Sequence, residues 1–202
     1  FDAVADIADA SETTVCGLAR VVDKDIEAAL DAGVDLVHVF ASTSDVQIED
    51  SMHATREEVL ERSVESVQRV KEAGVEVMFS PMDATRTAED YLIDVIEAVS
   101  EEGVDWINIP DTCGVATPTR FKDLIEIVTD HTDARVDVHC HDDLGPATAN
   151  AMVRFEAGAH QPHVRVNGFG ERPGHPAFEE VRMAVSLHYP LATGIAPTHL
   201  TE

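Results

Sequence analysis

The sequence predicts an α/β fold, a (β/α)8 TIM barrel that is incomplete in this chain, with strands three to eight present and strands one and two missing. Three observations support this fold class. Strand and helix patterns alternate strictly, which indicates a parallel sheet. A unit of helix, glycine and apolar strand recurs four times. No dinucleotide-type glycine fingerprint follows the first strand, which favours a barrel over a doubly wound sheet. A complete barrel needs about 250 residues, whereas the chain has 202.

The recurring unit marks the end of one helix and the start of the next strand. Its glycine suits the left-handed conformation that closes a helix, and the short apolar run after it is typical of a buried strand. The four copies occupy residues 31–39, 72–79, 101–109 and, more loosely, 156–164. Strands are therefore expected to start near Thr13, Asp35, Val75, Val104, Arg135 and His163.

Two helix starts are signalled by their capping residues. Thr55 and Glu58 form a capping box, and Thr117 followed by Pro118 gives an N-cap with proline at the first helical position. After the capping box, apolar residues recur at helical spacing and are expected to face the core. This stripe consists of Val59, Leu60, Val64, Val67 and Val70.

Residues 89–102 and 147–157 are also periodic enough for helices. Phe1–Asp6 reads as the middle of a helix, not as a natural start or a signal peptide. We therefore expect a fragment whose missing strands precede Phe1. Residues 1–190 are expected to form the partial barrel, and residues 191–202 to begin a C-terminal linker.

The charge of the chain is strongly acidic, with 39 Asp and Glu against 14 Lys and Arg and a formal net charge of −25. Such a field repels nucleic acid and anionic membrane surfaces. No run of about 18 apolar residues is present that could span a membrane. The acids are spread over the polar faces of predicted helices, as at Glu57, Glu58, Glu61 and Glu65. We interpret them as a solvated surface of the halophilic kind, suited to a salt-rich cytosol.

The cysteines point to a reducing compartment. Cys16, Cys113 and Cys140 are odd in number and widely spaced, so they form neither a disulfide framework nor a C-x-x-C site. A cytoplasmic location is the simplest inference.

The run His139-Cys140-His141 is the strongest chemical signal. Residues i and i+2 of a strand point to the same face, and the active sites of such barrels lie at the C-terminal ends of the strands. Two imidazoles at such a position are suited to hold one metal ion. The alternative is a pair of polar histidines without metal; the position at the barrel mouth, followed by Asp142 and Asp143, favours the metal.

A glycine-rich loop, residues 167–175, follows the last predicted strand. Three glycines in these nine residues let backbone approach a ligand closely. The spacing G-x-G-x-x-x-G is not the dinucleotide pattern, and taken alone it is equally consistent with a flexible loop.

Five segments, in the same order, resemble one family of metal-dependent barrels. The chain from about Thr13 to Met183 is similar to the 2-isopropylmalate, citramalate and homocitrate synthases, and most similar to the 2-isopropylmalate synthases. The segments that carry the resemblance are His38–Asp45, Asp83–Thr87, Asn108–Thr112, His139–Gly145 and Asn167–His175.

The resemblance implies a divalent metal site (Mn, Mg, Zn or Co). In the family both histidines of H-C-H are ligands, which here are His139 and His141. His175 stands where the family has an asparagine ligand. The remaining family ligand, an aspartate in an R-D-G segment of strand one, is absent. More nitrogen in the ligand set shifts preference from Mg²⁺ toward Mn²⁺, Co²⁺ or Zn²⁺, and affinity is expected to fall below about pH 6.5, where imidazole protonates.

The resemblance also implies catalytic and substrate-binding residues. His38 matches a histidine that lines the 2-oxo acid pocket, Thr112 a threonine that contacts the substrate carboxylate, and Ser80 a serine after strand five. Met82 stands where many members have a glutamate, so either a water network is rearranged or Asp83 substitutes. The glycine loop is expected to contribute Asn167, Gly168, Gly170 and Glu171 to substrate binding.

The implied reaction is a Claisen condensation by an acyltransferase. The metal polarises the ketone of a 2-oxo acid, the enolate of acetyl-CoA attacks it, and thioester hydrolysis makes the step irreversible. We expect 2-oxoisovalerate as substrate and 2-isopropylmalate, on the route to leucine, as product. Pyruvate with citramalate as product is one alternative, and a non-catalytic binding or assembly barrel is another. The full-length protein is expected to be a homodimer, and the 202-residue chain alone to be inactive.

Two other enzyme classes with similar barrels fit less well. A biotin-dependent carboxyltransferase needs a lysine at the metal on a strand, but Lys24, Lys71 and Lys122 fall in predicted helices or at their ends. A lyase of the hydroxymethylglutaryl-CoA type carries a cysteine in its last glycine loop, and residues 167–175 contain none.

Overall fold

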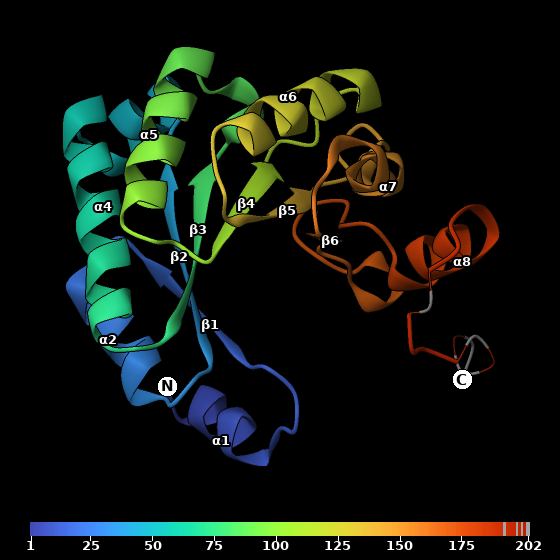
Figure 1. The fold of residues 1–202 in the computed structure, drawn as a ribbon, viewed down its shortest axis with the longest axis horizontal. Helices are drawn as coiled ribbons and strands as arrows, with labels where there is room; N and C mark the ends of the chain where they lie inside the picture. The colour runs from blue at the N-terminus through green and yellow to red at the C-terminus, as the bar shows by residue number, and fades with distance from the viewer. Residues whose placement is uncertain (192, 197, 199, 201–202) are drawn as a thin grey trace.

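A computed structural model describes residues 1–191, 193–196, 198 and 200. Its centre is a curved six-stranded sheet in the order β1-β2-β3-β4-β5-β6, with every neighbouring pair parallel (Figure 1). The sheet has two ends, β1 and β6, which do not pair with each other. This confirms the predicted incomplete barrel. The strands are β1 Cys16–Arg20, β2 Leu36–Ser42, β3 Glu76–Met82, β4 Trp106–Asp111, β5 Arg135–Cys140 and β6 Gln161–Pro162.

Helices alternate with the strands and cover the outer side of the sheet. Contacts of α2 with β1, α4 with β2 and β3, α5 with β3, and α7 with β5 form this layer (Figure 1). Among the described residues, no helix is both long and apolar enough to cross a membrane. The helices are α1 Asp2–Ala10, α2 Asp23–Asp31, α3 Asp45–Gln47, α4 Arg56–Glu72, α5 Glu89–Glu101, α6 Pro118–Asp130, α7 Ala147–Ala157 and α8 Phe178–His188, with short turns η1 Ile48–Met52, η2 Ala84–Arg86 and η3 Val166–Gly168.

Strand alternation decides which side chains the helices bury. On the helix side lie fully buried apolar residues such as Val39, Phe79 and Ile109. The residues next to them in sequence point to the concave side, which in a closed barrel is the interior. Polar side chains that could bind a ligand or take part in a reaction lie on that concave side, toward the C-terminal ends of the strands. Among them are His38, Ser80, Asn108 and His139.

The predicted helix boundaries agree closely with the structure. Thr55 accepts a hydrogen bond from the Glu58 backbone N–H while the Glu58 carboxylate accepts one from the Thr55 backbone N–H, so the capping box is complete. Thr117 caps α6, with proline at the first turn. The helical reading of the chain start is confirmed by α1. All four repeat glycines have positive φ: Gly33, Gly74, Gly103 and Gly158.

Two sequence predictions were wrong in detail. The last strand does not begin near His163; β6 is Gln161–Pro162, because Pro162 has no N–H to donate to a longer ladder. Backbone N–H groups of His160 and His163 still donate to the carbonyls of Val136 and Val138 on β5.

The core stripe of α4 was confirmed only in part: Val59, Val67 and Val70 are fully buried, and Leu60 packs against the core from a half-buried position. Leu60 and Val64 are only half-buried, whereas Ser63 and Ser66 lie in the core beside Val59. Ser63 is tolerated there because its hydroxyl donates to the Val59 carbonyl at 2.7 Å, which satisfies a polar group that burial would otherwise penalise.

The C-terminal segment is described only in part. Helix α8 ends at His188, and beyond it Arg182 donates to the Ile195 carbonyl at 2.8 Å. Residues 192, 197, 199, 201 and 202 of the predicted linker lie outside the described residues.

The acidic surface leads to a first testable prediction. Glu57, Glu58, Glu61 and Glu65 are all exposed on α4, and the net charge of −25 is self-repelling. Raising KCl from 0.1 to about 1 M shortens the Debye length from about 10 to about 3 Å. The Tm of the whole protein is therefore expected to rise by at least about 3 °C, which corresponds to about 1 kcal/mol. Calorimetry in KCl, rather than in stabilising sulfate, measures it, and an unchanged or lower Tm would contradict the halophilic interpretation.

Candidate metal centre

Three histidines meet where β5 ends. His139 and His141 flank Cys140, whose side chain is buried on the helix side. His175 comes from the loop that leads into α8. That loop lies against the end of β5 because the Asp142 backbone N–H donates to the Gly174 carbonyl at 3.1 Å. One strand end and one loop therefore supply the three imidazoles.

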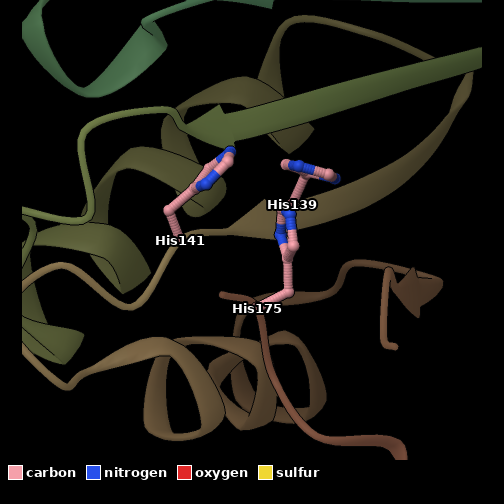
Figure 2. A group of neighbouring side chains, drawn as sticks. All are labelled: His139, His141 and His175. Atoms are coloured by element: carbon pink, nitrogen blue, oxygen red, sulfur yellow. The ribbon is translucent and has the colours of Figure 1, made fainter. Parts of the chain in front are cut away.

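The rings of His139, His141 and His175 point toward one another (Figure 2). One nitrogen of each lies within 4.8 Å of a nitrogen of the other two. The ring centroids are 5.2 Å apart for His139 and His141, 4.8 Å for His139 and His175, and 4.3 Å for His141 and His175. We call these three residues the histidine triad.

The glycines of residues 167–175 make room for this arrangement. A methyl group at position 170 would lie 2.5 Å from Nε2 of His175 and closer still to its Cδ2. A methyl group at position 174 would overlap the carbonyl oxygen of Gly168, and the His175 backbone N–H donates to that same carbonyl at 3.0 Å. The sequence suggested that these glycines admit a ligand; in the structure they admit the His175 ring and the backbone of the loop itself.

Hydrogen bonds leave lone pairs available inside the triad. Nδ1 of His175 lies 3.2 Å from the Cys140 carbonyl oxygen. A carbonyl only accepts, so Nδ1 carries the proton and Nε2 keeps a free lone pair. Nδ1 of His141 is buried without a hydrogen-bond partner among the described residues. A buried, unpaired imidazole nitrogen beside two other imidazoles fits a divalent metal ion, which would satisfy it.

Burial holds the triad in the neutral form that binds metal. It lowers the pKa of His141 to about 4, with the neighbouring His175 adding to the effect. Desolvation and the surrounding histidines lower the pKa of His139 well below its usual range, and desolvation also lowers the pKa of His175. The expected loss of metal below about pH 6.5 therefore shifts to a more acidic range.

The triad forms one wall of a pocket of about 360 Å³. Of the site residues predicted from the sequence, eight line it: His38, Ser80, Thr112, His139, His141, Gly170, Glu171 and His175. Asn167 and Gly168 do not line it; the backbone N–H of Asn167 donates to the Glu179 carboxylate at 3.0 Å.

Four apolar residues also line the pocket, and sequence reasoning missed most of them. They are Leu18, Phe40, Met82 and Pro110, here called the apolar wall. Three of them stand two positions from another lining residue on the same strand, as Phe40 does from His38. Strand alternation could therefore have identified them once one lining residue of each strand was known.

Two hydrogen bonds orient the polar side chains of the pocket. Nε2 of His38 lies 2.6 Å from the Ser80 hydroxyl oxygen. The hydroxyl oxygen of Thr112 accepts from the Asp83 backbone N–H at 2.8 Å, so its own O–H is free to donate to a ligand. Desolvation, with a smaller effect of His163, lowers the pKa of His38 to about 3.

Asp83 does not take the place of the missing glutamate. Its side chain is fully buried and accepts from the Ser44 hydroxyl at 2.5 Å and from Nε and Nη2 of Arg86 at 2.9 and 2.6 Å. It is not among the residues that line the pocket, whereas Met82 is. The hypothesis that Asp83 substitutes is therefore wrong, because its carboxylate is engaged in building the loop after β3.

A second feature that the sequence did not indicate is an ion pair across the site. Arg172 of the glycine loop donates to both carboxylate oxygens of Asp143, at 2.8 and 2.9 Å, and to the Thr112 carbonyl at 2.5 Å. It therefore ties the loop that carries His175 to the ends of β4 and β5. Nothing in the local pattern distinguishes this arginine from the others on the surface.

The buried histidines lead to a prediction about acid stability. An unfolded chain protonates His38 near pH 6.5, whereas burial lowers the pKa in the folded state to about 3. Below pH 6.5 the unfolded state therefore binds more protons, so the stability contribution is complete above pH 6.5 and is lost as the pH falls toward 3. The urea midpoint of the metal-free whole protein is expected to fall between pH 7 and 4.5. In His38→Gln the fall of the urea midpoint with pH should be shallower. An equal slope of midpoint against pH in both proteins would contradict a low pKa of His38 in the folded state.

Known proteins of one family are similar to this chain in sequence. The model of the HMGL-like family matches residues 1–202. A protein of Methanopyrus kandleri named "Probable 2-isopropylmalate synthase" is 47% identical over a match of 203 residues that covers 100% of this chain and 41% of that protein. The 2-isopropylmalate synthase of Methanocaldococcus jannaschii is 42% identical over 191 residues, 95% of this chain and 37% of that protein. The chain thus spans about two fifths of the length of these relatives.

The fold also resembles solved structures. The crystal structure of hydroxymethylglutaryl-CoA lyase from Pseudomonas aeruginosa superposes with a TM-score of 0.82 at 26% identity, and the match covers 97% of this chain and 70% of that one.

Proposed function

Because the chain belongs to the HMGL-like family, we propose that the whole protein is an acyltransferase that makes 2-isopropylmalate, a step of leucine biosynthesis. It would condense acetyl-CoA with 2-oxoisovalerate and consume one water, which releases coenzyme A. The observation that carries the proposal is one pocket that is lined both by the histidine triad and by apolar side chains. The names of the relatives at 42–47% identity support the same reaction.

His139, His141 and His175 would hold the divalent ion. Such an ion supplies Lewis acidity toward the ketone of the 2-oxo acid. The triad is neutral because burial depresses its pKa values, so three imidazoles can donate lone pairs at physiological pH without first losing protons. The nitrogen-rich set supports Mn²⁺, Co²⁺ or Zn²⁺ over Mg²⁺.

Thr112, His38 and Ser80 would bind and orient the 2-oxo acid. The Thr112 hydroxyl oxygen accepts a hydrogen bond from the Asp83 backbone N–H, so the hydroxyl proton of Thr112 is directed to an acceptor in the pocket. The substrate carboxylate is the acceptor we propose. Nε2 of His38 lies 2.6 Å from the Ser80 hydroxyl oxygen, so each of these side chains fixes the orientation of the other within the pocket. A preorganised pair of this kind lowers the entropic cost of positioning the ketone.

The apolar wall would receive the branched side chain of the substrate. Leu18, Phe40, Met82 and Pro110 offer no hydrogen bonds there, and burial of each additional methyl group is worth about 0.8 kcal/mol. 2-Oxoisovalerate has two more carbons than pyruvate, which corresponds to about 1.6 kcal/mol, or roughly tenfold in rate.

Two properties of the whole protein complete the proposal. We place it in the cytoplasm, which is supported by three cysteines that are all free in the described structure. We also propose that it works as a homodimer, and size-exclusion chromatography with light scattering tests this point.

Steady-state kinetics of the whole protein test the substrate. Release of coenzyme A from acetyl-CoA is followed with either 2-oxo acid, with and without a chelator. A kcat/KM about tenfold higher for 2-oxoisovalerate than for pyruvate is expected, and activity should disappear with the chelator. A higher value for pyruvate would identify a citramalate synthase instead, and no turnover with either acid would favour a non-catalytic barrel.

A further inference from the structure

Three side chains are linked by hydrogen bonds in the order Asp137–His163–His139, and the proposed chemistry uses only the last of them. We propose that His163 is a positioning residue. Held by Asp137, it receives the proton on Nδ1 of His139 and so turns the Nε2 lone pair of His139 toward the metal ion. The inference deepens the proposed function and rests on its metal site.

This series of hydrogen-bonded side chains starts at a deeply buried carboxylate. Asp137 lies on the concave side of β5, two positions before His139, and its side chain is completely buried. Its Oδ2 accepts from the Gln161 amide at 2.9 Å and faces Nε2 of His163 at 3.3 Å. A carboxylate only accepts when ionised, so His163 carries its proton on Nε2.

The other nitrogen of His163 is then an acceptor, and two donors approach it. Nδ1 of His163 lies 3.0 Å from Nδ1 of His139 and 3.4 Å from the side-chain amide nitrogen of Asn108. The amide nitrogen only donates, which agrees with a lone pair on His163 Nδ1. His139 must therefore present a proton at Nδ1, and its Nε2 is left with the lone pair.

The result for His139 matches what a carbonyl does for His175. There the Cys140 carbonyl receives the Nδ1 proton, which leaves Nε2 for the ion. Metal-binding histidines in general have the second nitrogen fixed in this way, and loss of the partner costs about 10- to 100-fold in metal affinity.

Burial of Asp137 is difficult to explain as packing alone. Its Oδ1 has no hydrogen-bond partner in the described part of the chain, and an incompletely paired buried carboxylate is costly. Neighbouring positions on the helix side of the same strand are filled by Val136 and Val138, which pack without such a cost. A role in orienting His139 gives the carboxylate a reason to be there.

Two variants of the whole protein test the inference. His163→Phe fills the space but removes the hydrogen bonds to Asp137 and His139. Mn²⁺ affinity, measured by electron paramagnetic resonance of the free ion, is therefore expected to weaken about 10- to 100-fold. His163→Gln keeps a donor toward Asp137 and an acceptor toward His139, so it should restore affinity to within a fewfold of the wild type. A crystal structure of the Mn²⁺ form should show His139 bound through Nε2, with Nδ1 next to His163.

Controls separate this role from folding and from the proposed function. In case His163→Phe unfolds around the unpaired Asp137, the double variant Asp137→Asn/His163→Phe removes the buried charge and should show the same loss. His160→Phe changes a histidine of the same region that faces the Val136 N–H instead of the triad, and it should bind Mn²⁺ like the wild type.

Unchanged Mn²⁺ affinity in His163→Phe and in the double variant Asp137→Asn/His163→Phe, or His139 bound through Nδ1, would overturn the positioning role. If affinity falls and is rescued by glutamine while the wild type shows no condensation, the positioning role stands and the proposed reaction fails.

Discussion

Replacement of His139 or His141 by alanine in the whole protein is expected to lower kcat/KM for condensation by at least about 10³-fold. Each change removes one of the three imidazoles that converge within 4.8 Å. Loss of a bound Lewis acid costs several kcal/mol of transition-state stabilisation, and each 1.36 kcal/mol is a factor of ten. Initial rates with saturating acetyl-CoA measure the effect, and a Mn²⁺ titration should show weaker binding in parallel.

A surface histidine provides the matched control. His131 pairs with Glu97 at 2.8 Å on the outside of the barrel, so His131→Ala should retain wild-type kcat/KM and metal affinity. Retention of more than about a tenth of the activity in either His139→Ala or His141→Ala would show that the triad does not hold the catalytic metal.

The second large effect is expected from a single methyl group. In Gly170→Ala the new Cβ would lie 2.5 Å from Nε2 of His175 and nearer still to Cδ2. The φ angle of Gly170 is not in the left-handed region, so the backbone accepts alanine, and the ring has to move. We expect a loss of about 10²-fold in kcat/KM, which is typical when a functional group is displaced by about 1 Å, with little change in Tm.

Gly33→Ala is the converse control. Gly33 has φ +70° at the end of α2 and open space around its Cβ position. Alanine there should cost about 1 kcal/mol of stability through backbone strain and leave activity intact. Equal activities of Gly170→Ala and the wild type would show that the position of the His175 ring does not matter for catalysis.

Local rules were sufficient to predict the framework from the sequence. Capping at Thr55 and Thr117, and helix-ending glycines such as Gly33, depend on neighbours within a few residues. The joint orientation of His139 and His141 follows from strand alternation in the same way. Such features are set by the chain itself, so the sequence alone contains the information.

Features that depend on distant segments could not be predicted in this way. The bond from Arg172 to Asp143 joins residues 29 positions apart, and His163 meets His139 from the segment that follows β6. Asp83 follows β3 directly and looked available to the site, but its left-handed backbone, φ 69°, and the pairing with Arg86 direct it into the interior. Only the assembled sheet decides which polar groups share a cavity.

His175, the third ligand that we propose, distinguishes this site most clearly. In the sequence, His175 stands where the family that the chain resembles has an asparagine. In the structure, the ring centroid of His175 lies 4.8 Å from that of His139. If both residues ligate, His175→Asn should keep activity and shift metal preference toward Mg²⁺, because an amide oxygen replaces an imidazole nitrogen.

X-ray absorption at the metal edge of the Co²⁺-loaded whole protein tests the histidine triad most directly, since multiple scattering counts coordinated imidazoles. The structure predicts three imidazoles on each ion in the wild type, at metal–nitrogen distances of about 2.1 Å, and two in His175→Ala. Two or fewer imidazoles in the wild type, or the same number in both proteins, would contradict a metal centre built from His139, His141 and His175.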